Sequence, residues 1–478
     1  MATGAGSLPA MSVPGLQAAV DKLRADGGGA ATVAAFEHAA RRLAAGEGGV
    51  MPESEIEPVA GLPDSDALPD PGDEVTGLLD RTVVLKLNGG LGTSMGMTRA
   101  KSLLQVRDGL SFLDIIARQV LALRAGHDGP SAPRLPLILM DSFRTREDSL
   151  AALQIHGALS AGLEPDFIQS RVPKLLDDGT LAPVAWPGDP DLEWAPPGHG
   201  DLYPALAASG MLTRLLDQGY RWAFVSNADN LGATLDPRIL AWIAREDIPF
   251  LMEVADRTPA DRKGGHLARR AGGEGLVLRE VAQTPEADLE VFQDITRHRF
   301  FNTNTIWLDL ERVAAGLAGG GVIDLPMIIN RKTVDPSDPG SPAVIQLETA
   351  MGAAIAGFPG ARALRVPRTR FLPVKTTDDL LALRSDAYVL DDRSRVVASP
   401  GRGGAGQPHV RLDPRWYRLV DDFESRFPAG PPSLVDCAAL TVEGDVRFGR
   451  GVVVRGTVTV SQDGDAQRKI ADGAVLTG

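Results

Sequence analysis

The sequence LNGGLGTSMGMTRAKS at residues 87–102 places four glycines within eight positions. The apolar run VVL at 83–85 leads into it, and a helical pattern begins after it at Phe112. A strand, a glycine-rich loop and a helix in this order are typical of a loop that wraps a phosphate group. The segment therefore predicts an anion-binding turn at the end of a strand.

Three of these glycines, Gly89, Gly90 and Gly92, lack a Cβ atom that would restrict φ or keep a ligand away from the backbone. Successive N–H groups in such a turn form a concave anion site, and Lys101 can add a mobile positive charge. A glycine-rich turn that binds nothing is the alternative, and for this segment alone it is the more common one. The rest of the chain decides between them.

The composition is ordinary for a globular protein, and 478 residues suffice for two or three domains. The net charge of −13 and a pI near 5.1 argue against nucleic acid or an anionic membrane as the main partner. The single Cys437 excludes an internal disulfide, and the seven scattered histidines argue against a zinc hydrolase. No apolar run reaches the roughly 18 residues of a membrane span. We expect a soluble, cytoplasmic protein.

Residues 1–80 are expected to form an N-terminal helical segment and an acidic arm. Residues 1–12 have the composition of a disordered end, and residues 13–46 contain two amphipathic helical patterns separated by glycines. Residues 51–80 hold nine acidic residues, several prolines and no lysine or arginine. This composition predicts an extended, solvated arm.

Residues 81–397 alternate short apolar runs with helical patterns. The runs lie at 82–87, 135–140, 221–227 and 248–256. Apolar strands separated by helices predict an α/β domain with a mostly parallel sheet that is covered on both faces. Ligands bind such sheets beyond the C-terminal strand ends, so the residues that follow each run are the best candidates for a site.

The spacing of apolar residues in the C-terminal part of the chain differs from that in residues 81–397. A Gly/Pro linker at 398–410 precedes residues 411–478, which contain a helical piece and then apolar positions that recur every six residues. Two phased six-residue series predict a parallel β-helix of about two coils, and a β-meander is the alternative. The series are Leu440, Val446, Val452, Val458 and Val442, Phe448, Val454, Val460.

Two motifs that follow predicted strands indicate a nucleotide site. Asn227 ends the run at 221–227, and Ala228 and Asp229 follow it directly. An aspartate at this place can hold Mg²⁺ on a nucleotide phosphate. A helix N-cap is the alternative role. Gln169 follows the segment PDFI, and its amide can both donate to and accept from a uracil edge. A glutamine in a turn is more often merely solvated, so this second motif is weak alone.

Other polar residues next to turns or strands extend this set. His199 follows Gly198 in a turn that opens a helix, where it can donate to a phosphate, although a structural histidine is the common alternative. Lys263, Asn304 and Lys375 each offer a cation or an amide. For any single lysine a solvated surface position is the usual role.

Together these segments resemble the UTP–glucose-1-phosphate uridylyltransferase family of the eukaryotic type. The resemblance runs in register from about residue 82 to 478 and includes the C-terminal LTVEGDVRFGRGVVVRGTV. Nine ordered motifs carry it, and their joint occurrence outweighs the alternatives for each one. They are LNGGLGTSMG, PLILMDSF, FIQSRVPKL, PPGHGDLY, FVSNADNLGATLD, MEVADRTPADRKGGHL, FNTNTIWL, VIQLETAMGAAI and RFLPVKTTDDLL.

The resemblance implies a GT-A-like, Rossmann-related nucleotidyltransferase domain followed by a short left-handed parallel β-helix. It implies reversible, Mg²⁺-dependent uridylyl transfer from UTP to glucose 1-phosphate, which gives UDP-glucose and pyrophosphate. A uridylyltransferase for another sugar 1-phosphate, or for several, is the alternative. The resemblance also suggests a homo-oligomer formed through the β-helix, although the sequence ends short of the family's usual final strand.

The resemblance also implies residue roles. The catalytic residues would be Lys375, Lys101 and Asp229, with Asp229 as the metal ligand. The nucleotide-binding positions would be Leu87, Asn88, Gly89, Gly90, Lys101, Gln169, Gly198, Asp229 and Lys375. His199 and Asn227 would contact the sugar phosphate. The full set of substrate-binding positions would be Gly89, Gly90, His199, Asn227, Ala228, Asp229, Lys263 and Asn304.

This chemistry needs alignment and charge neutralisation rather than a nucleophilic side chain. We expect a phosphate oxygen of glucose 1-phosphate to attack the α-phosphorus of UTP in line with the departing pyrophosphate. Mg²⁺ on Asp229, together with Lys101 and Lys375, would offset the charge. The sequence departs from the family where Arg99-Ala100 replaces the usual Gly-Pro before Lys101, so Arg99 could add a second charge.

Two rival functions come from other classes. A dinucleotide-dependent dehydrogenase would need a G-x-G-x-x-G loop that opens a helix at once, and the spacing of Gly90, Gly92 and Gly96 does not match it. A catalytically inactive scaffold would have no need of Asp229 together with the two lysines. The sequence therefore favours the uridylyltransferase.

Overall fold

The computed structural model describes residues 14–126, 132–273, 275–464 and 466–478, so the expected disorder of residues 1–12 lies outside the described residues. The helices are α1 Pro14–Ala25, α2 Ala30–Ala44, α3 Val75–Asp80, α4 Phe112–Ala125, α5 Arg146–Leu153, α6 Leu202–Ala208, α7 Met211–Asp217, α8 Pro237–Arg245, α9 Leu289–Phe292, α10 Leu310–Leu317, α11 Thr377–Arg384, α12 Pro414–Tyr417 and α13 Val420–Arg426. The strands are β1 Ile56–Pro58, β2 Thr82–Asn88, β3 Gln105–Arg107, β4 Leu110–Ser111, β5 Leu137–Asp141, β6 Asp166–Ile168, β7 Val172–Pro173, β8 Leu175–Leu176, β9 Trp194–Ala195, β10 Trp222–Asn227, β11 Phe250–Asp256, β12 His266–Arg270, β13 Leu276–Arg279, β14 Phe300–Asp309, β15 Met327–Thr333, β16 Ala343–Thr349, β17 Arg362–Arg365, β18 Tyr388–Leu390, β19 Val396–Ala398, β20 His409–Leu412, β21 Cys437–Glu443, β22 Val446–Phe448, β23 Val453–Ser461, β24 Arg468–Ile470 and β25 Val475–Thr477.

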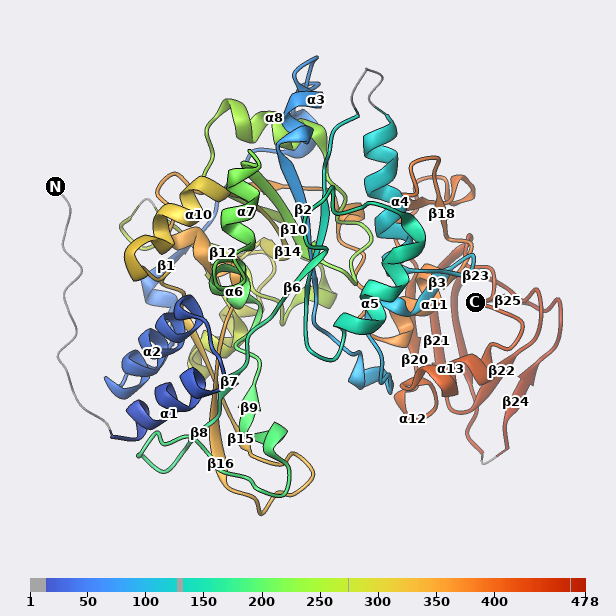
Figure 1. The fold of residues 1–478 in the computed structure, drawn as a ribbon. Coiled ribbons are helices and arrows are strands. Elements are labelled where there is room, and N and C mark those ends of the chain that lie inside the picture. The colour runs from blue at the N-terminus through green and yellow to red at the C-terminus, as the bar shows by residue number, and fades with distance from the viewer. Residues whose placement is uncertain (1–13, 127–131, 274, 465) are drawn as a thin grey trace.

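A ten-stranded sheet lies at the centre of the molecule (Figure 1). Its main path is β1-β12-β14-β10-β2-β5-β6, and β11, β13 and β17 join it from the side. The neighbours β10, β2, β5 and β6 are parallel, whereas β14 is antiparallel to β10. Within this sheet only β1, β13 and β14 oppose the direction of the other strands. The predicted mostly parallel sheet is confirmed, and all four predicted strands belong to it.

Helices cover both faces of this sheet, as predicted. On β2 alternate side chains face opposite sides, because a strand has a period of two residues. Val84 belongs to the hydrophobic cluster that contains α4, α8 and α11 residues. Val83 and Leu85 belong to the cluster that contains α6, α7 and α10 residues.

Local signals explain where the helices around the site begin and end. Ser111 caps α4: its Oγ accepts from the N–H of Asp114 at 3.1 Å, and Asp114 Oδ2 accepts from the N–H of Ser111 at 2.9 Å. The helical pattern at 202–219 forms two helices, α6 and α7, because Gly210 between them has a φ of 71°.

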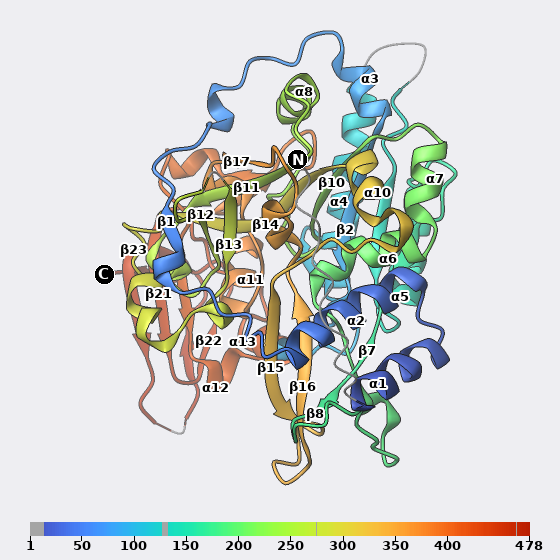
Figure 2. The ribbon, with the colours of Figure 1, turned by 90° about the vertical axis from the view of Figure 1, so that its left-hand side faces the viewer.

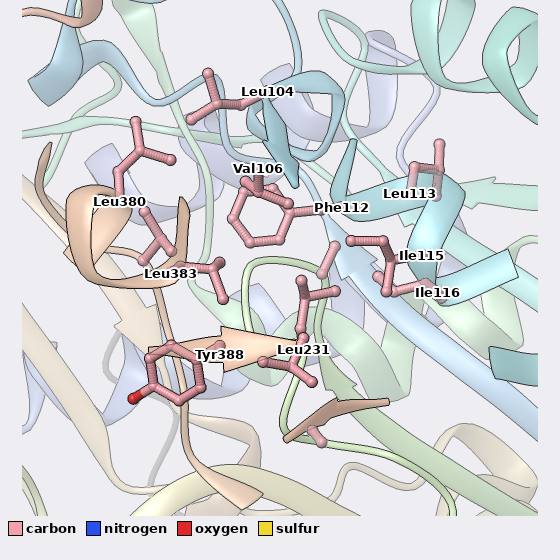
Figure 3. Close-up of a cluster of buried hydrophobic side chains, with 14 of the residues drawn as sticks. Leu104, Val106, Phe112, Leu113, Ile115, Ile116, Leu231, Leu380, Leu383 and Tyr388 are labelled. Atoms are coloured by element: carbon pink, nitrogen blue, oxygen red, sulfur yellow. The ribbon is translucent and has the colours of Figure 1, made fainter. Parts of the chain in front are cut away.

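One buried cluster links three segments of the chain (Figure 3). Phe112 and Ile116 of α4 lie in it with Leu380 and Leu383 of α11 and with Leu231. Burying each of these side chains is worth roughly 1.5–3 kcal/mol. Because α4 follows the glycine loop, α11 follows residue 375 and Leu231 lies just after residue 229, this core holds the three segments in register.

The N-terminal residues pack against a second, three-stranded sheet, β15-β16-β8, as Figure 2 shows for α1 and α2. The acidic arm is largely solvated, as predicted: within residues 51–80 only Ile56, Val59, Ser65 and Leu79 are buried. It is not extended throughout, because it ends in α3, and it is fixed to the fold at several points. Its β1 pairs with β12, where Ile56 is buried, and Glu53 accepts a 2.7 Å hydrogen bond from the fully buried Arg279. The two arginines that pair with Glu53 lie more than 200 residues away, so the local composition of the arm could not reveal them.

The C-terminal strands pair as the six-residue period predicts. β20, β21, β23 and β25 are parallel neighbours, and β22 is parallel to β24. All eight residues of the two series are buried, and Leu440 pairs with Val458, three repeats further on. Because a β-meander has antiparallel neighbours, that alternative is wrong.

The linker between the two parts is anchored to the C-terminal strands. Arg402 is buried and donates to the carbonyl oxygens of Leu434 at 2.7 Å and of Cys437 at 3.2 Å. One hydrophobic cluster continues from α4 and α11 into these strands. The division at residues 80, 397 and 410 stays a prediction. Among the described helices, none combines the length and the apolar character that crossing a membrane requires.

Candidate active site

A cavity of about 630 Å³ opens at the C-terminal ends of β2, β5 and β10. This is the sheet edge at which a mostly parallel sheet is expected to bind its ligand. The structure brings together here eleven of the residues predicted from the sequence: Leu87, Asn88, Gly89, Gly90, Lys101, Gln169, Gly198, His199, Asn227, Ala228 and Asp229.

The glycine loop forms one wall of this cavity. Gly92 has a φ of 67°, so its lack of a side chain serves backbone conformation as predicted. Gly89 lies close to Gln169: a Cβ atom at residue 89 would lie 2.7 Å from Oε1 of Gln169 and would displace the end of that side chain. The loop closes where the N–H of Lys101 donates to the carbonyl of Gly90 at 3.0 Å.

Asp229 lies between two lysines. Its Oδ2 accepts from Lys101 Nζ at 2.8 Å and from Lys375 Nζ at 3.1 Å. Burial opposes ionisation of this carboxyl, but the ammonium groups of Lys375 and Lys101 outweigh it and lower its pKa. Lys375 does not line the cavity and is 57% exposed, whereas Lys101 is held inside by a further contact with the carbonyl of Val374.

The second carboxylate oxygen of Asp229 suits a metal ion. Oδ1 is buried and has no hydrogen-bond partner in the protein. Across the described ranges, no three His, Cys, Asp or Glu side chains gather at one point to hold a metal. Mg²⁺ in nucleotide enzymes commonly uses one or two carboxylates together with phosphate oxygens and water. The single free oxygen of Asp229 therefore fits Mg²⁺ that arrives with a nucleotide.

Gln169 joins opposite walls of the cavity. Its backbone N–H donates to the carbonyl of Asp141 at the end of β5, at 2.7 Å. Its side-chain Nε2 donates to the carbonyl of Gly198 at 3.1 Å, and its Oε1 faces Gly89. The amide thus lies between the glycine loop and the turn at 198–201.

His199 is a neutral hydrogen-bond donor. Its Nδ1 accepts from the N–H of Met351 at 3.0 Å, so the proton of the neutral ring resides on Nε2. Burial, with a smaller effect of the Lys375 charge, lowers its pKa to about 4. The ring therefore stays uncharged at neutral pH and can donate from Nε2 to an anion.

Two predicted site residues lie elsewhere. Lys263 is exposed and does not line the cavity. Asn304 has a φ of 55° at an irregularity of β14, and its Oδ1 accepts from Asn302 Nδ2 at 2.9 Å. Arg99 pairs with Asp148 at 3.0 Å, is 69% exposed and does not line the cavity, so the second charge suggested for it stays a prediction.

Eleven further cavity residues were not predicted as site residues: Ser142, Phe143, Arg144, Ser170, Arg171, Asp191, Trp194, Leu91, Ser102, Ala195 and Pro196. The first three follow β5 directly, so the strand-end rule could have found them. Ser170 and Arg171 are neighbours of Gln169. Asp191 and Trp194 reach the cavity only through the tertiary fold, and nothing local in the sequence marks them.

The chain is similar to known proteins over most of its length. A profile described as UTP–glucose-1-phosphate uridylyltransferase matches residues 33–455. The chain belongs to this family. The enzyme of that name from Solanum tuberosum is 42% identical over 404 residues, which cover 84% of this chain and 81% of the potato protein. The Hordeum vulgare enzyme is 41% identical over 409 residues, which cover 85% of this chain and 83% of the barley protein.

Solved structures of the uridylyltransferase family have the same fold. A Leishmania major UDP-glucose pyrophosphorylase variant in complex with UDP-glucose has a TM-score of 0.90 and 47% identity, and the match covers 98% of this chain and 99% of that one. The Trypanosoma brucei protein has a TM-score of 0.87 and 43% identity, and the match covers 97% of this chain and 98% of that one. The family predicted from the nine motifs is confirmed.

Proposed function

We propose that this protein transfers a uridylyl group between UTP and glucose 1-phosphate, with UDP-glucose and pyrophosphate as the products. The observation that carries the proposal is the cavity in which Gln169, His199, Lys101 and Asp229 converge, in a chain of the uridylyltransferase family. The UDP-glucose complex of the 47% identical Leishmania relative supports it. The C-terminal edge of the parallel strands places the cavity, and the polar side chains that line it provide the groups that the reaction needs.

On the nucleotide side, the Gln169 amide reads the uracil edge, because it can donate and accept at once. Backbone contacts hold the nucleotide and its phosphates, and they come from Leu87, Asn88, Gly89, Gly90 and Gly198. The side chain of Gln169 already lies between Gly89 and Gly198, with Oε1 next to Gly89 and Nε2 bonded to the carbonyl of Gly198. A uracil base that takes the place of these contacts would therefore meet an acceptor and a donor that are already in position. An amide that is already held in its binding orientation loses little conformational freedom when the base binds, and this strengthens binding.

On the sugar-phosphate side, His199 donates from Nε2 to a phosphate oxygen, next to Asn227 and Ala228. Lys263 and Asn304 stay proposed substrate-binding positions, although neither lines the cavity. The KM for glucose 1-phosphate in Lys263→Ala and Asn304→Ala tests this point. An unchanged KM in both would remove them from the site.

In the transfer step, a phosphate oxygen of glucose 1-phosphate attacks the α-phosphorus of UTP. A new P–O bond forms there while the bond from the α-phosphorus to the pyrophosphate oxygen breaks, so no covalent enzyme intermediate arises. Lys101 and Lys375 offset the charge on the α-phosphate and the leaving group. Asp229 holds both ammonium groups in place until the triphosphate binds.

Mg²⁺ is the proposed cofactor, and Asp229 would hold it through Oδ1, which is buried and has no partner in the protein. When bound, Mg²⁺ would supply positive charge against the triphosphate. Calorimetry of Mg²⁺–UTP binding tests this without turnover: Asp229→Asn should bind UTP with little dependence on Mg²⁺. An unchanged Mg²⁺ dependence in that variant would contradict the assignment.

Further parts of the proposal concern assembly and location. We propose that the C-terminal strands form a short left-handed β-helix; their parallel pairing at three-repeat spacing supports a coil. A homo-oligomer formed through this segment would appear in light scattering as a mass above 50.5 kDa. The single cysteine supports a cytoplasmic location, which cell fractionation tests.

The decisive assay is pyrophosphate release from UTP with a panel of sugar 1-phosphates, with and without Mg²⁺. Glucose 1-phosphate should have the highest kcat/KM among the glucose, galactose and N-acetylglucosamine compounds. Higher values for another sugar would establish the alternative substrate, and no release with any sugar would refute uridylyl transfer.

A further inference from the structure

The corner between α1 and α2 contacts the segment that follows Gln169. At the end of α1, Asp26 accepts two hydrogen bonds from the Arg171 guanidinium, from Nε at 2.8 Å and from Nη2 at 2.5 Å. At the start of α2, the hydroxyl of Thr32 lies 2.9 Å from the hydroxyl of Ser170. Both contacted residues line the cavity. Two N-terminal side chains thus hold the two residues next to the proposed uracil reader.

Arg171 is further restrained by aromatic rings of the cavity wall. Its guanidinium lies 4.6 Å from the ring centre of Trp194 and 5.7 Å from that of Phe143. The ammonium of Lys22, also on α1, lies 5.4 Å from the same Trp194 ring. Cation–π contacts with a common ring place α1 and Arg171 against one wall of the cavity.

Ser170 connects α2 to the opposite wall. Its backbone N–H donates to the buried carboxyl of Asp201 at 2.6 Å, in the same turn as His199. α6 begins directly after Asp201, and the corner packs tightly on it: a Cβ at Gly29 would lie 2.6 Å from Cβ of Ala208. The corner therefore contacts both the Gln169 segment and the helix that follows the His199 turn.

We propose that Asp26 and Thr32 are positioning residues for the nucleotide, which act through Arg171 and Ser170 on the orientation of the Gln169 amide. This inference rests on the proposed uridylyl transfer and gives residues 14–45 a part in it. The hydrogen bonds and ion pairs of Asp229 and the two lysines do not include the α1–α2 corner, so we expect the corner to govern nucleotide affinity and not the transfer step. A docked corner lowers the entropic cost of ordering the site when the nucleotide binds.

Linkage makes the effect reciprocal. If the docked corner favours nucleotide binding, a bound nucleotide must favour the docked corner by the same factor. A purely structural helix pair would stabilise the fold equally with and without nucleotide. Hydrogen exchange can therefore distinguish a positioning role from a merely structural one.

The test compares Asp26→Asn and Thr32→Val with the control Asp21→Asn. Asp21 lies on the same helix α1, but its partners are Gln17 and Arg24 on the exposed face. We expect the KM for UTP and the Kd for UDP-glucose to rise about three- to tenfold in the first two variants. The kcat should change less than twofold, and Asp26→Glu should recover part of the affinity.

In wild-type protein, UDP-glucose should slow amide exchange over residues 23–34, and this protection should shrink in Asp26→Asn. A KM for UTP in both variants equal to that of Asp21→Asn, or no nucleotide-dependent protection at residues 23–34, would overturn the proposal. If a variant fails to fold, exchange on the wild-type chain still decides. Absence of UTP turnover in the wild type would instead refute the proposed function, so the two failures are distinguishable.

Discussion

Replacing Asp229 by asparagine keeps the size of the side chain and removes its charge. The carboxylate accepts from Lys101 Nζ at 2.8 Å and from Lys375 Nζ at 3.1 Å, and its other oxygen is buried without a partner. Asparagine would present an NH₂ group either to the lysines or to the metal position. The substitution therefore disturbs the two cations and the proposed Mg²⁺ ligand at once.

Loss of the Asp229 charge affects Lys101 and Lys375 to different degrees. Removing one partner of a fully buried ion pair costs about 3–5 kcal/mol. Lys375 is 57% exposed and can turn to water, whereas Lys101 is only 14% exposed and keeps its contact with the carbonyl of Val374. We expect the free energy of unfolding to fall by less than that range, by about 1–3 kcal/mol.

The effect on turnover should be larger than the effect on stability. Loss of a single preorganised donor costs roughly a factor of 100–1,000 in kcat, and Asp229 orients two cations as well as the metal. We expect kcat to fall at least about 1,000-fold, which corresponds to about 4 kcal/mol of transition-state stabilisation.

Pyrophosphate release and urea unfolding, measured on the same preparation, check both values. Asp217→Asn serves as the control, because Asp217 is exposed at the end of α7. An Asp229→Asn kcat within tenfold of wild type would refute the role given to this carboxylate. A loss of activity that tracks unfolding would assign the residue to stability alone.

Three further predictions follow from the geometry. Lys375→Ala should lower kcat by several orders of magnitude with an unchanged unfolding curve, because its side chain is more than half exposed; near-normal turnover would refute its role. Gly89→Ala should raise the KM for UTP by at least about tenfold, since its Cβ would lie 2.7 Å from Gln169 Oε1; an unchanged KM would show that the amide moves freely. His266 has its pKa lowered by burial from 6.5 to about 2, so below pH 6.5 the unfolded chain binds a proton that the folded chain does not. Through this group the free energy of unfolding should fall by about 2 kcal/mol between pH 7 and pH 5. In urea unfolding, the pH dependence should be smaller by that amount in His266→Gln but not in the exposed His409→Gln.

The strand-end rule explains why most of the site could be predicted from the sequence. Asn88, Asp141 and Asn227 end three parallel neighbours, so residues adjacent to them in the chain meet at one edge. The alternation of apolar runs and helices determines this arrangement. Gly92 likewise has the positive φ expected of a loop glycine.

Contacts between distant segments could not be predicted in this way. The close approach of Gly89 to Gln169, eighty residues later, depends on the tertiary fold. The same holds for the ion pairs of Glu53, in the acidic arm, with Arg279 and Arg297. The Asp26–Arg171 pair joins residues 145 positions apart. The composition of a segment gives only its own charge and hydrophobicity, whereas these contacts depend on which segments the fold brings side by side.

The most direct test of uridylyl transfer follows the label of [α-³²P]UTP in the wild-type protein with glucose 1-phosphate and Mg²⁺. The proposed site predicts that the label passes to UDP-glucose, with one pyrophosphate released for each molecule formed and no labelled protein. Label that remains in UTP, appears as UMP without glucose 1-phosphate, or becomes attached to the chain would contradict direct transfer in this cavity.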